Sequence, residues 1–195
     1  MTKDFIKKAI FALKKGELIC YPTDTLYGIG ADIYSIRSVK KVFEIKNRPS
    51  SMPLSVAVSN KKSLEKVAFA NDISKKLFEN FLPGPLCMIL KKRKTIHNAV
   101  TSGLETVAIR VPKNKTCLKL LSDFGPITCT SANLHKSPTP NTISDIYMQF
   151  KDDISVYIDE GVLDSKPSTI VDVSDGKVKI IRQGAISREE IFDVI

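Results

Sequence analysis

Apolar residues recur along the chain at two spacings, and the change between them predicts an alternation of helices and strands. In the first 15 residues they lie three to four positions apart, as on one helix face: Phe5, Ile6, Ala9, Ile10 and Leu13. Similar spacing predicts helices over 2–15, 61–69, 73–81 behind Asp72 as cap, 115–122, 143–150 and 187–194, and one that starts behind Ser35. Short apolar runs predict strands at 17–21, 54–58, 86–90, 107–111, 127–130, 155–158, 168–173 and 177–182.

Helices and strands in alternation are typical of the α/β class. The length of 195 residues fits one domain, so we expect a single domain over 1–195 with a twisted mixed β-sheet flanked by helices. Asp175 and Gly176 between the last two strands predict a hairpin, and therefore an antiparallel part of the sheet.

Composition and charge narrow the class of protein. The hydrophobic share of 43% and the charged share of 26% are those of a soluble globular protein, which we expect in the cytoplasm. No apolar run approaches the roughly 20 residues that span a bilayer, so no membrane contact is expected. The net charge of +9 favours anionic partners such as nucleotides, phosphates or RNA, although exposed helix lysines alone could produce it.

The sequence gives little support for a metal site or for a catalytic triad. The cysteines at 20, 87, 117 and 129 are far apart and form no C-x-x-C pair, which favours buried reduced thiols. With only His97 and His135 available, neither a histidine metal site nor a Ser-His-Asp triad is indicated. We expect no protein-bound metal.

The stretch from Glu17 to Asp32 is the first candidate for a site. Pro22 ends the opening strand because it has no N–H to donate, and Thr23, Asp24 and Thr25 then place three oxygen-bearing side chains at the strand end. Gly28 and Gly30 after them allow unusual backbone angles and close approach. Such a turn commonly lines a small-molecule site, but an ordinary turn followed by a helix cap fits equally well.

Three cations form the second candidate. Continuing the apolar stripe of the helix behind Ser35 places Lys46 on its inward face, with Arg48 just before the break at Pro49. A favourable interaction with the helix dipole explains their charge but not their direction. In the strand around Arg110, alternation puts this arginine on the same face as Thr106 and Ala108, where it could grip a carboxylate or phosphate; the alternative is a solvent-facing edge strand.

Taken in order, seven stretches resemble the YrdC-like threonylcarbamoyl-AMP synthase family. They run across nearly the whole chain: YPTDTLYGIGAD (21–32), KNRPSSMPLSV (46–56), PGPL (83–86), TVAIRVP (106–112), TSAN (130–133), STIVD (168–172) and IIRQGAI (180–186). Lys46 and Arg48, together with Ser131 and Asn133, resemble the signature tetrad of the family. The chain resembles its short, single-domain branch, and the resemblance implies a twisted α/β fold with a concave basic face.

The resemblance also implies a reaction. L-Threonine, bicarbonate and ATP, with Mg²⁺ carried on the ATP, would give threonylcarbamoyl-AMP and pyrophosphate. A separate threonylcarbamoyl transferase would then modify position 37 of tRNA, and the chain itself could contact tRNA or other RNA.

Residue roles carry over by position. The residues that match catalytic positions are Lys46, Arg48 and Arg110. Those that match ATP-binding positions are Lys46, Arg48, Ser50, Thr106, Ser131, Asn133, Thr139 and Arg182. Those that match threonine-binding positions are Thr23, Ser55, Arg110, Cys129 and Ser168. The sequence departs from the family at Cys87, where threonine is usual, and at 134–137, which lacks a common glycine.

Two other functions remain open from the sequence. The first is a basic RNA-binding module without catalysis, which the charge favours but the missing KH, RRM and helix-turn-helix patterns do not. The second is the carbamoyl-transfer module of hydrogenase maturation, which normally sits in a longer chain with zinc-binding segments.

Overall fold

The computed structural model describes residues 2–195, and the side chains of residues 4–195. Its helices have these bounds: α1 Thr2–Lys14, α2 Ile36–Ile45, α3 Lys61–Glu65, α4 Asp72–Phe81, α5 Asn98–Thr101, α6 Lys115–Phe124, α7 Ile143–Phe150 and α8 Arg188–Asp193, with a 3₁₀ turn at Lys151–Asp153. Its strands are β1 Ile19–Tyr21, β2 Gly28–Gly30, β3 Ser55–Ala57, β4 Leu86–Lys91, β5 Thr106–Arg110, β6 Ile127–Thr128, β7 Thr130–Ser131, β8 Val156–Tyr157, β9 Thr169–Asp172 and β10 Lys179–Arg182.

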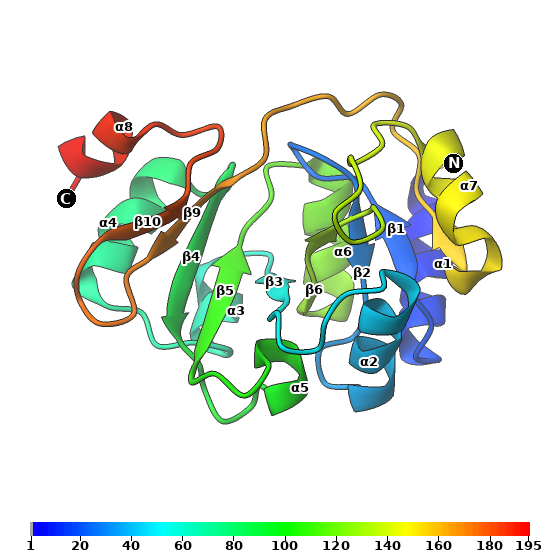
Figure 1. Cartoon of the computed structure of the whole chain (residues 1–195), viewed down its shortest axis with the longest axis horizontal. Coiled ribbons are helices and arrows are strands. Elements are labelled where there is room, and N and C mark those ends of the chain that lie inside the picture. Colours follow the sequence, from blue (N-terminus) through cyan, green and yellow to red (C-terminus); the bar gives the residue numbers. More distant parts are fainter. Residues whose placement is uncertain (1) are drawn as a thin grey trace.

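The strands form two mixed sheets, where we expected one. The smaller has the order β7-β2-β1-β8 and the larger the order β10-β9-β4-β5-β3-β6. In Figure 1 the larger sheet lies on the side of α4 and α8, and the smaller on the side of α1 and α7. The predicted strand at 127–130 is split between them, because β6 pairs with β3 while β7 pairs with β2. The α/β class with mixed pairing is confirmed.

Local signals placed most elements well. Ser35 accepts the N–H of Ser38 and caps α2, as predicted. The hairpin at Asp175 and Gly176 also forms, since β9 and β10 are antiparallel neighbours. The predicted cap of α4 was wrong: Asn71, not Asp72, accepts the N–H of Ser74 and forms a capping box.

Gly28 and Gly30 lie in strand β2 rather than in a turn. A Cβ on Gly30 would approach Ile19, Ile127 and the Tyr21 ring at 2.9 to 3.0 Å. These glycines are therefore needed for close approach across the β1–β2 pair, not for unusual backbone angles.

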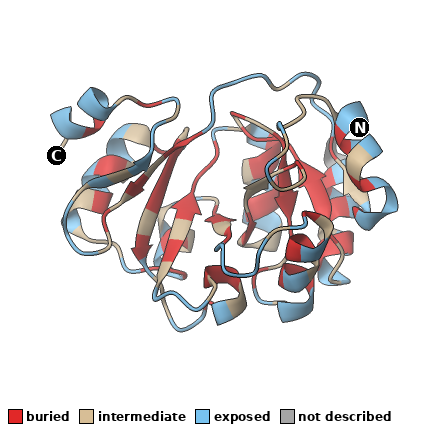
Figure 2. Cartoon of the chain, in the orientation of Figure 1, coloured by how far each residue is buried: buried red, intermediate tan, exposed pale blue. Residues whose placement is uncertain are grey.

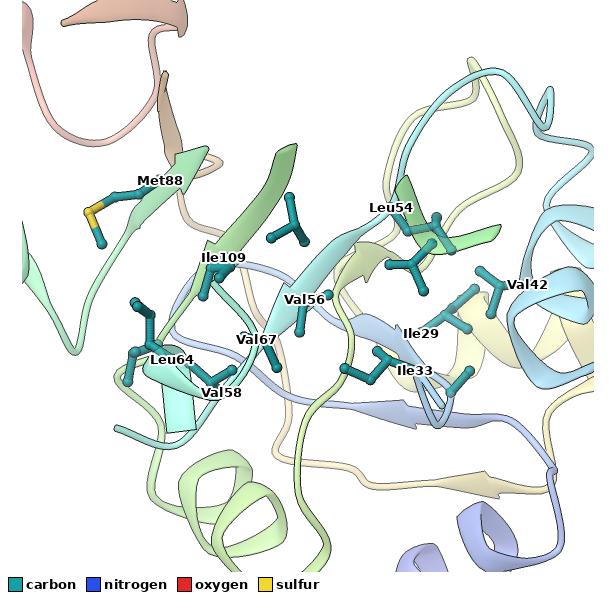
Figure 3. Packing of buried hydrophobic residues seen from close by; sticks show 14 of the residues in the cluster. Ile29, Ile33, Val42, Leu54, Val56, Val58, Leu64, Val67, Met88 and Ile109 are labelled. Carbon is teal, nitrogen blue, oxygen red and sulfur yellow. The ribbon is translucent and has the colours of Figure 1, made fainter. Parts of the chain in front are cut away.

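Two hydrophobic clusters hold the helices on the sheets. The larger joins both sheets with α2 and α4 through residues such as Ile29, Val42, Val56, Leu77 and Met88, and part of it is drawn in Figure 3. The smaller packs α1 against β1 and α6. Most strands and the inner helix faces are buried, whereas strand β10 and the segment that connects β8 to β9 are mostly exposed (Figure 2). No helix within the described residues is long and apolar enough to cross a membrane.

Candidate active site

The first wall of the candidate site is one face of the six-stranded sheet. Alternation along β4 and β5 sends Met88 and Ile109 into the core and leaves Cys87, Ala108 and Arg110 on the opposite face. The register places Cys87 directly opposite Arg110. This face lines a cavity of about 570 Å³.

The second wall comes from the smaller sheet and its connections. It consists of the turn after β1 and the chain around β7: Thr23, Thr25, Leu26, Tyr27, Gly28, Cys129, Thr130 and Ser131. The remaining lining residues are Arg48, Pro53, Leu54, Ser55, Ile89, Thr139, Ser165, Pro167, Ser168, Ile170, Ile181 and Arg182. The cavity thus lies between the two sheets, where hydroxyl groups from both walls face three arginines.

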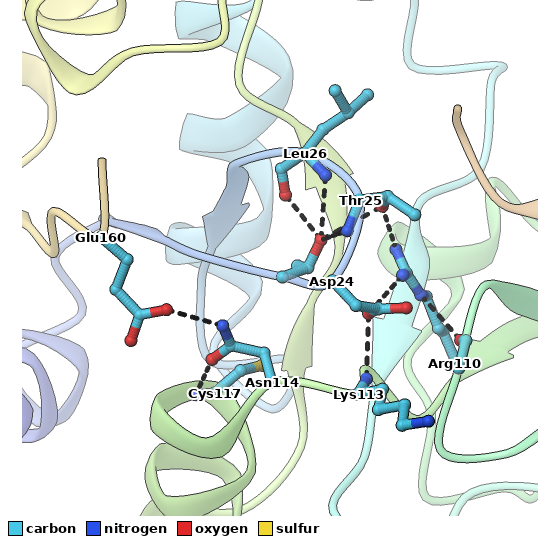
Figure 4. Close-up of polar contacts among 10 residues, drawn as sticks. Asp24, Thr25, Leu26, Arg110, Lys113, Asn114, Cys117 and Glu160 are labelled. Carbon is cyan, nitrogen blue, oxygen red and sulfur yellow. Dashed lines mark hydrogen bonds and ion pairs between the residues drawn. The ribbon is translucent and has the colours of Figure 1, made fainter. Parts of the chain in front are cut away.

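Arg110 is the most deeply placed of these arginines, with only 6% of its surface exposed. Its Nη2 donates to Oδ1 of Asp24 at 2.6 Å, its Nη1 to Oγ1 of Thr25 at 2.9 Å, and its Nε to the carbonyl of Gly84 at 3.4 Å (Figure 4). β5 lies between β4 and β3, so the alternative of a solvent-facing edge strand is wrong.

Thr23 both stabilises the turn after β1 and lines the cavity. Its Oγ1 accepts the N–H groups of Thr25 and Leu26 and lies 2.6 Å from the carbonyl oxygen of Leu26, to which it donates. These bonds shape the turn that presents Asp24 and Thr25 to Arg110. The predicted turn is confirmed, but the helix cap after it is wrong, because strand β2 follows the turn. The site stays a prediction.

Lys46 caps the C-terminus of α2 and is 2% exposed, so the inward direction predicted from the stripe is confirmed. Its Nζ donates to the carbonyl oxygens of Ser131 and Asn133, both at 2.5 Å. Burial and, to a smaller extent, the nearby charge of Arg48 together lower the pKa of Lys46 to about 7. The ammonium is therefore costly to keep charged unless an anion approaches it.

Arg48 and Arg182 lie on the cavity with backbone partners. Arg48 donates to the carbonyls of Met52 and Pro53, and partial burial lowers its pKa. Arg182 donates to the carbonyl of Ser168 at 2.8 Å. Since these partners are neutral, the positive charge of both side chains remains available to an anionic ligand.

Of the thirteen residues matched to site positions of the family from the sequence, nine line the cavity: Thr23, Arg48, Ser55, Arg110, Cys129, Ser131, Thr139, Ser168 and Arg182. Four do not: Lys46, Ser50, Thr106 and Asn133. Ser50 is exposed, and Thr106 lies at the far end of β5 from Arg110. Asn133 accepts the hydroxyl of Ser131 at 2.6 Å and donates to the carbonyls of Leu134 and Ser137, so it braces the loop behind the cavity.

Sequence reasoning gave no role to several lining residues. Cys87 and Ile89 could have been found, because they share the alternation of β4 that pairs them with the Arg110 face. Burial raises the pKa of the Cys87 thiol to about 11, so this side chain is a neutral part of the wall. Tyr27 carried no signal, and its role depends on long-range contacts with residues 159–161.

Charge and ligand chemistry at the cavity favour anions over cations. Among residues 4–195, no three histidine, cysteine, aspartate or glutamate side chains gather closely enough to hold a metal ion. The arrangement instead offers three guanidinium groups and several hydroxyl groups, which suit carboxylate and phosphate oxygens.

Several known proteins are similar to this chain in sequence. The Sua5/YciO/YrdC family model, described as "Telomere recombination", matches residues 11–184. A putative threonylcarbamoyl-AMP synthase of Methanocaldococcus jannaschii is 38% identical over 189 residues, which cover 96% of this chain and 88% of that protein.

Two solved structures are also similar. The crystal structure of Pyrococcus abyssi Sua5 complexed with L-threonine has a TM-score of 0.92 at 33% identity, and the match covers 97% of this chain and 57% of that one. The crystal structure of Escherichia coli YciO has a TM-score of 0.89 at 25% identity, and the match covers 98% and 94% of the two chains.

Proposed function

Since this chain belongs to the Sua5/YciO/YrdC family, we propose that it is a threonylcarbamoyl-AMP synthase that makes threonylcarbamoyl-AMP and pyrophosphate from L-threonine, bicarbonate and ATP. The observation that carries the proposal is the convergence of Arg48, Arg110 and Arg182 on one cavity between the sheets. An amino acid and a nucleoside triphosphate both bring anionic groups to such a cavity.

The proposed threonine position lies at the inner end of the cavity. Arg110 receives the carboxylate, because a guanidinium can meet two carboxylate oxygens with parallel N–H bonds. Thr23, Ser55, Cys129 and Ser168 surround it and bind the rest of the amino acid.

The proposed ATP position lies along the rim. Arg48, Ser131, Thr139 and Arg182 face the triphosphate or the nucleoside from the cavity wall. Lys46 lies directly behind Ser131 and reaches the phosphates by exchanging its carbonyl partners for phosphate oxygens. Asn133 acts through Ser131, while Ser50 and Thr106 contact the nucleotide from outside the cavity. Mg²⁺ arrives with ATP as part of the substrate.

The reaction needs no covalent intermediate on the protein. The threonine amine forms a bond to the carbon of CO₂, derived from bicarbonate, and releases a proton to solvent. A carbamate oxygen then bonds to the α-phosphorus as the bond to the β-phosphate oxygen breaks and pyrophosphate leaves. The chain supplies alignment, where effective molarities can reach about 10⁵ to 10⁸ M. Its cations stabilise the charge that develops on the phosphate oxygens.

Pyrophosphate release from the purified protein tests this function. The parent chain should release pyrophosphate only when threonine, bicarbonate and ATP are all present, and Arg110→Ala and Lys46→Ala should lose that activity while staying folded. Arg93→Ala is the matched control, since Arg93 stacks on Phe69 outside the cavity and should keep parental activity. Full activity in Arg110→Ala or Lys46→Ala would refute the assignment of that residue.

The product would pass to a threonylcarbamoyl transferase that modifies tRNA, and contact with tRNA is a second candidate activity favoured by the net charge of +9. Titration with tRNA across salt concentrations measures it. Affinity that falls steeply with salt supports direct contact, whereas no binding at low salt rejects it.

A further inference from the structure

Asp24 holds the guanidinium of Arg110 from the opposite wall of the cavity. Its Oδ1 accepts two bonds, from Nη2 of Arg110 at 2.6 Å and from the backbone N–H of Lys113 at 2.9 Å. Both charged side chains are largely buried, at 7% exposed for Arg110 and 13% for Asp24. The ion pair therefore joins the turn after β1 to the strand β5 across the two sheets (Figure 4).

The contacts around Arg110 determine which of its donors remain for a ligand. A guanidinium has five N–H groups. Three of them donate to Gly84, Thr25 and Asp24. The remaining two belong to Nη1 and Nη2, one on each terminal nitrogen, and they are the donors left for a ligand.

We infer that Asp24 is a positioning residue for substrate recognition: it fixes the orientation of the Arg110 guanidinium so that its two remaining N–H groups bind the carboxylate of the amino-acid substrate. This inference rests on the proposed function. Asp24 itself does not contact the substrate; it acts through Arg110, and through Lys113 it also fixes the chain that leaves β5.

Orientation and charge predict opposite effects when Asp24 is removed. If Asp24 mainly neutralises Arg110, its loss leaves a stronger positive charge and threonine binds more tightly. If Asp24 mainly orients Arg110, its loss lets the side chain turn away and threonine binds more weakly. The buried bond of 2.6 Å to a fixed turn favours orientation.

The test compares binding of L-threonine, of threoninol and of ATP to the folded full-length chain by titration calorimetry. Threoninol lacks the carboxylate, so the ratio of the threonine affinity to the threoninol affinity reports how strongly Arg110 binds that carboxylate. We expect Asp24→Ala to weaken threonine binding by about 10- to 100-fold, which is the effect of losing one charge-assisted hydrogen bond between Arg110 and the threonine carboxylate. The affinity for ATP should be nearly unchanged. The preference for threonine over threoninol should shrink by the same factor.

Two further variants keep the test decisive. Asp24→Asn retains an acceptor oxygen for Arg110 and Lys113, so it should fold even if Asp24→Ala does not, and it should show a smaller loss in the same direction. Asp32→Ala is the matched control, because Asp32 is half-buried, accepts a backbone N–H from Tyr34 and forms no ion pair with the side chains of residues 4–195. It should leave the preference for threonine unchanged.

The outcomes separate the inference from the function on which it rests. If the parent binds threonine and a folded Asp24 variant binds it equally or more tightly, the positioning role is wrong and the proposed function stands. If the variants lose threonine and threoninol affinity equally, the role is also wrong, because the effect is a general distortion. If the parent binds neither threonine nor ATP, the proposed function fails together with the inference.

Discussion

Lys46 combines deep burial, two carbonyl partners and a pKa lowered to about 7. The unfolded chain holds this proton up to about pH 10.4, so between pH 7 and 10 the unfolded state binds more protons than the folded state. The contribution of Lys46 to the free energy of unfolding therefore rises with pH across this window and is least favourable below pH 7.

Proton uptake on ATP binding follows from this environment. Phosphate oxygens near Nζ favour the ammonium and raise the pKa of Lys46, so ATP binding at pH 8 should take up about one proton per site. Calorimetry in buffers of different ionisation enthalpy measures this number. Lys46→Met should abolish the uptake, whereas Lys61→Met, at a half-exposed lysine that pairs with Glu79, should keep it. Equal uptake in the parent and in Lys46→Met would contradict a phosphate-binding role.

Gly184 lies where no side chain fits. A Cβ there would be 2.1 Å from the carbonyl oxygen of Pro167 and 2.5 Å from the carbonyl carbon of Ser168, and neither backbone atom can give way cheaply. We expect Gly184→Ala to lower the free energy of unfolding by about 1–3 kcal/mol and to raise the KM for ATP, because it displaces the chain beside Arg182.

Urea unfolding and steady-state kinetics measure both effects of Gly184→Ala. Ala185→Ser changes the exposed neighbour and should behave like the parent. Unchanged stability in Gly184→Ala would contradict the close packing at this position.

Between strand β8 and strand β9 the chain forms an exposed connection over residues 159–167, here called the strap. Tyr27 anchors its start: the buried hydroxyl accepts the N–H of Glu160 at 2.9 Å and donates to the carbonyl of Gly161 at 2.8 Å, with Asp159 as a second acceptor. Burial raises the pKa of Tyr27 to about 12, so it is a neutral donor at physiological pH. Ser165 and Pro167, at the other end of the strap, line the cavity.

Tyr27→Phe should therefore loosen the strap without unfolding the chain. We expect a loss of about 0.5–1.5 kcal/mol in the free energy of unfolding, since the hydrogen bonds to Tyr27 are lost while the exposed Glu160 N–H and Gly161 carbonyl can bind water instead. Hydrogen exchange should speed up at 160 and 161. Tyr157→Phe, which loses a bond to the Lys151 carbonyl outside the strap, should leave exchange there unchanged. Unaltered strap exchange in Tyr27→Phe would reject the anchor.

The sequence predicted elements and directions better than connections between elements. Period-two alternation placed Arg110 on the open face of β5, and the stripe of α2 placed Lys46 inward, because both depend on local geometry alone. The division of 127–130 between two sheets depends on distant partners in β2 and β3, so no local pattern could reveal it. Asp24 and Tyr27 likewise owe their roles to contacts more than 80 residues away.

At the scale of the whole molecule, short links tie the two sheets together. β6 and β7 are separated by Cys129 alone, yet they belong to different sheets. Thr128 also donates to the carbonyl of Ile29 and accepts the N–H of Ala31, and the Asp24–Arg110 pair spans the cavity. We therefore propose that residues 1–195 form one cooperative domain.

A single calorimetric transition would be the signature of that domain. The measured and van't Hoff enthalpies of unfolding should agree, as they do for two-state domains. Two resolved transitions, one for each sheet, would contradict the proposal. The Asp24→Ala variant should lower the transition temperature without splitting the transition.

Mass spectrometry of the reaction product tests the central claim most directly. The purified chain is incubated with L-threonine, ATP, Mg²⁺ and ¹³C-labelled bicarbonate, and the products are analysed before hydrolysis. Our account predicts threonylcarbamoyl-AMP that carries the labelled carbon, formed together with pyrophosphate and absent when threonine is omitted. ATP cleavage without labelled product, or a labelled product that does not require threonine, would contradict it.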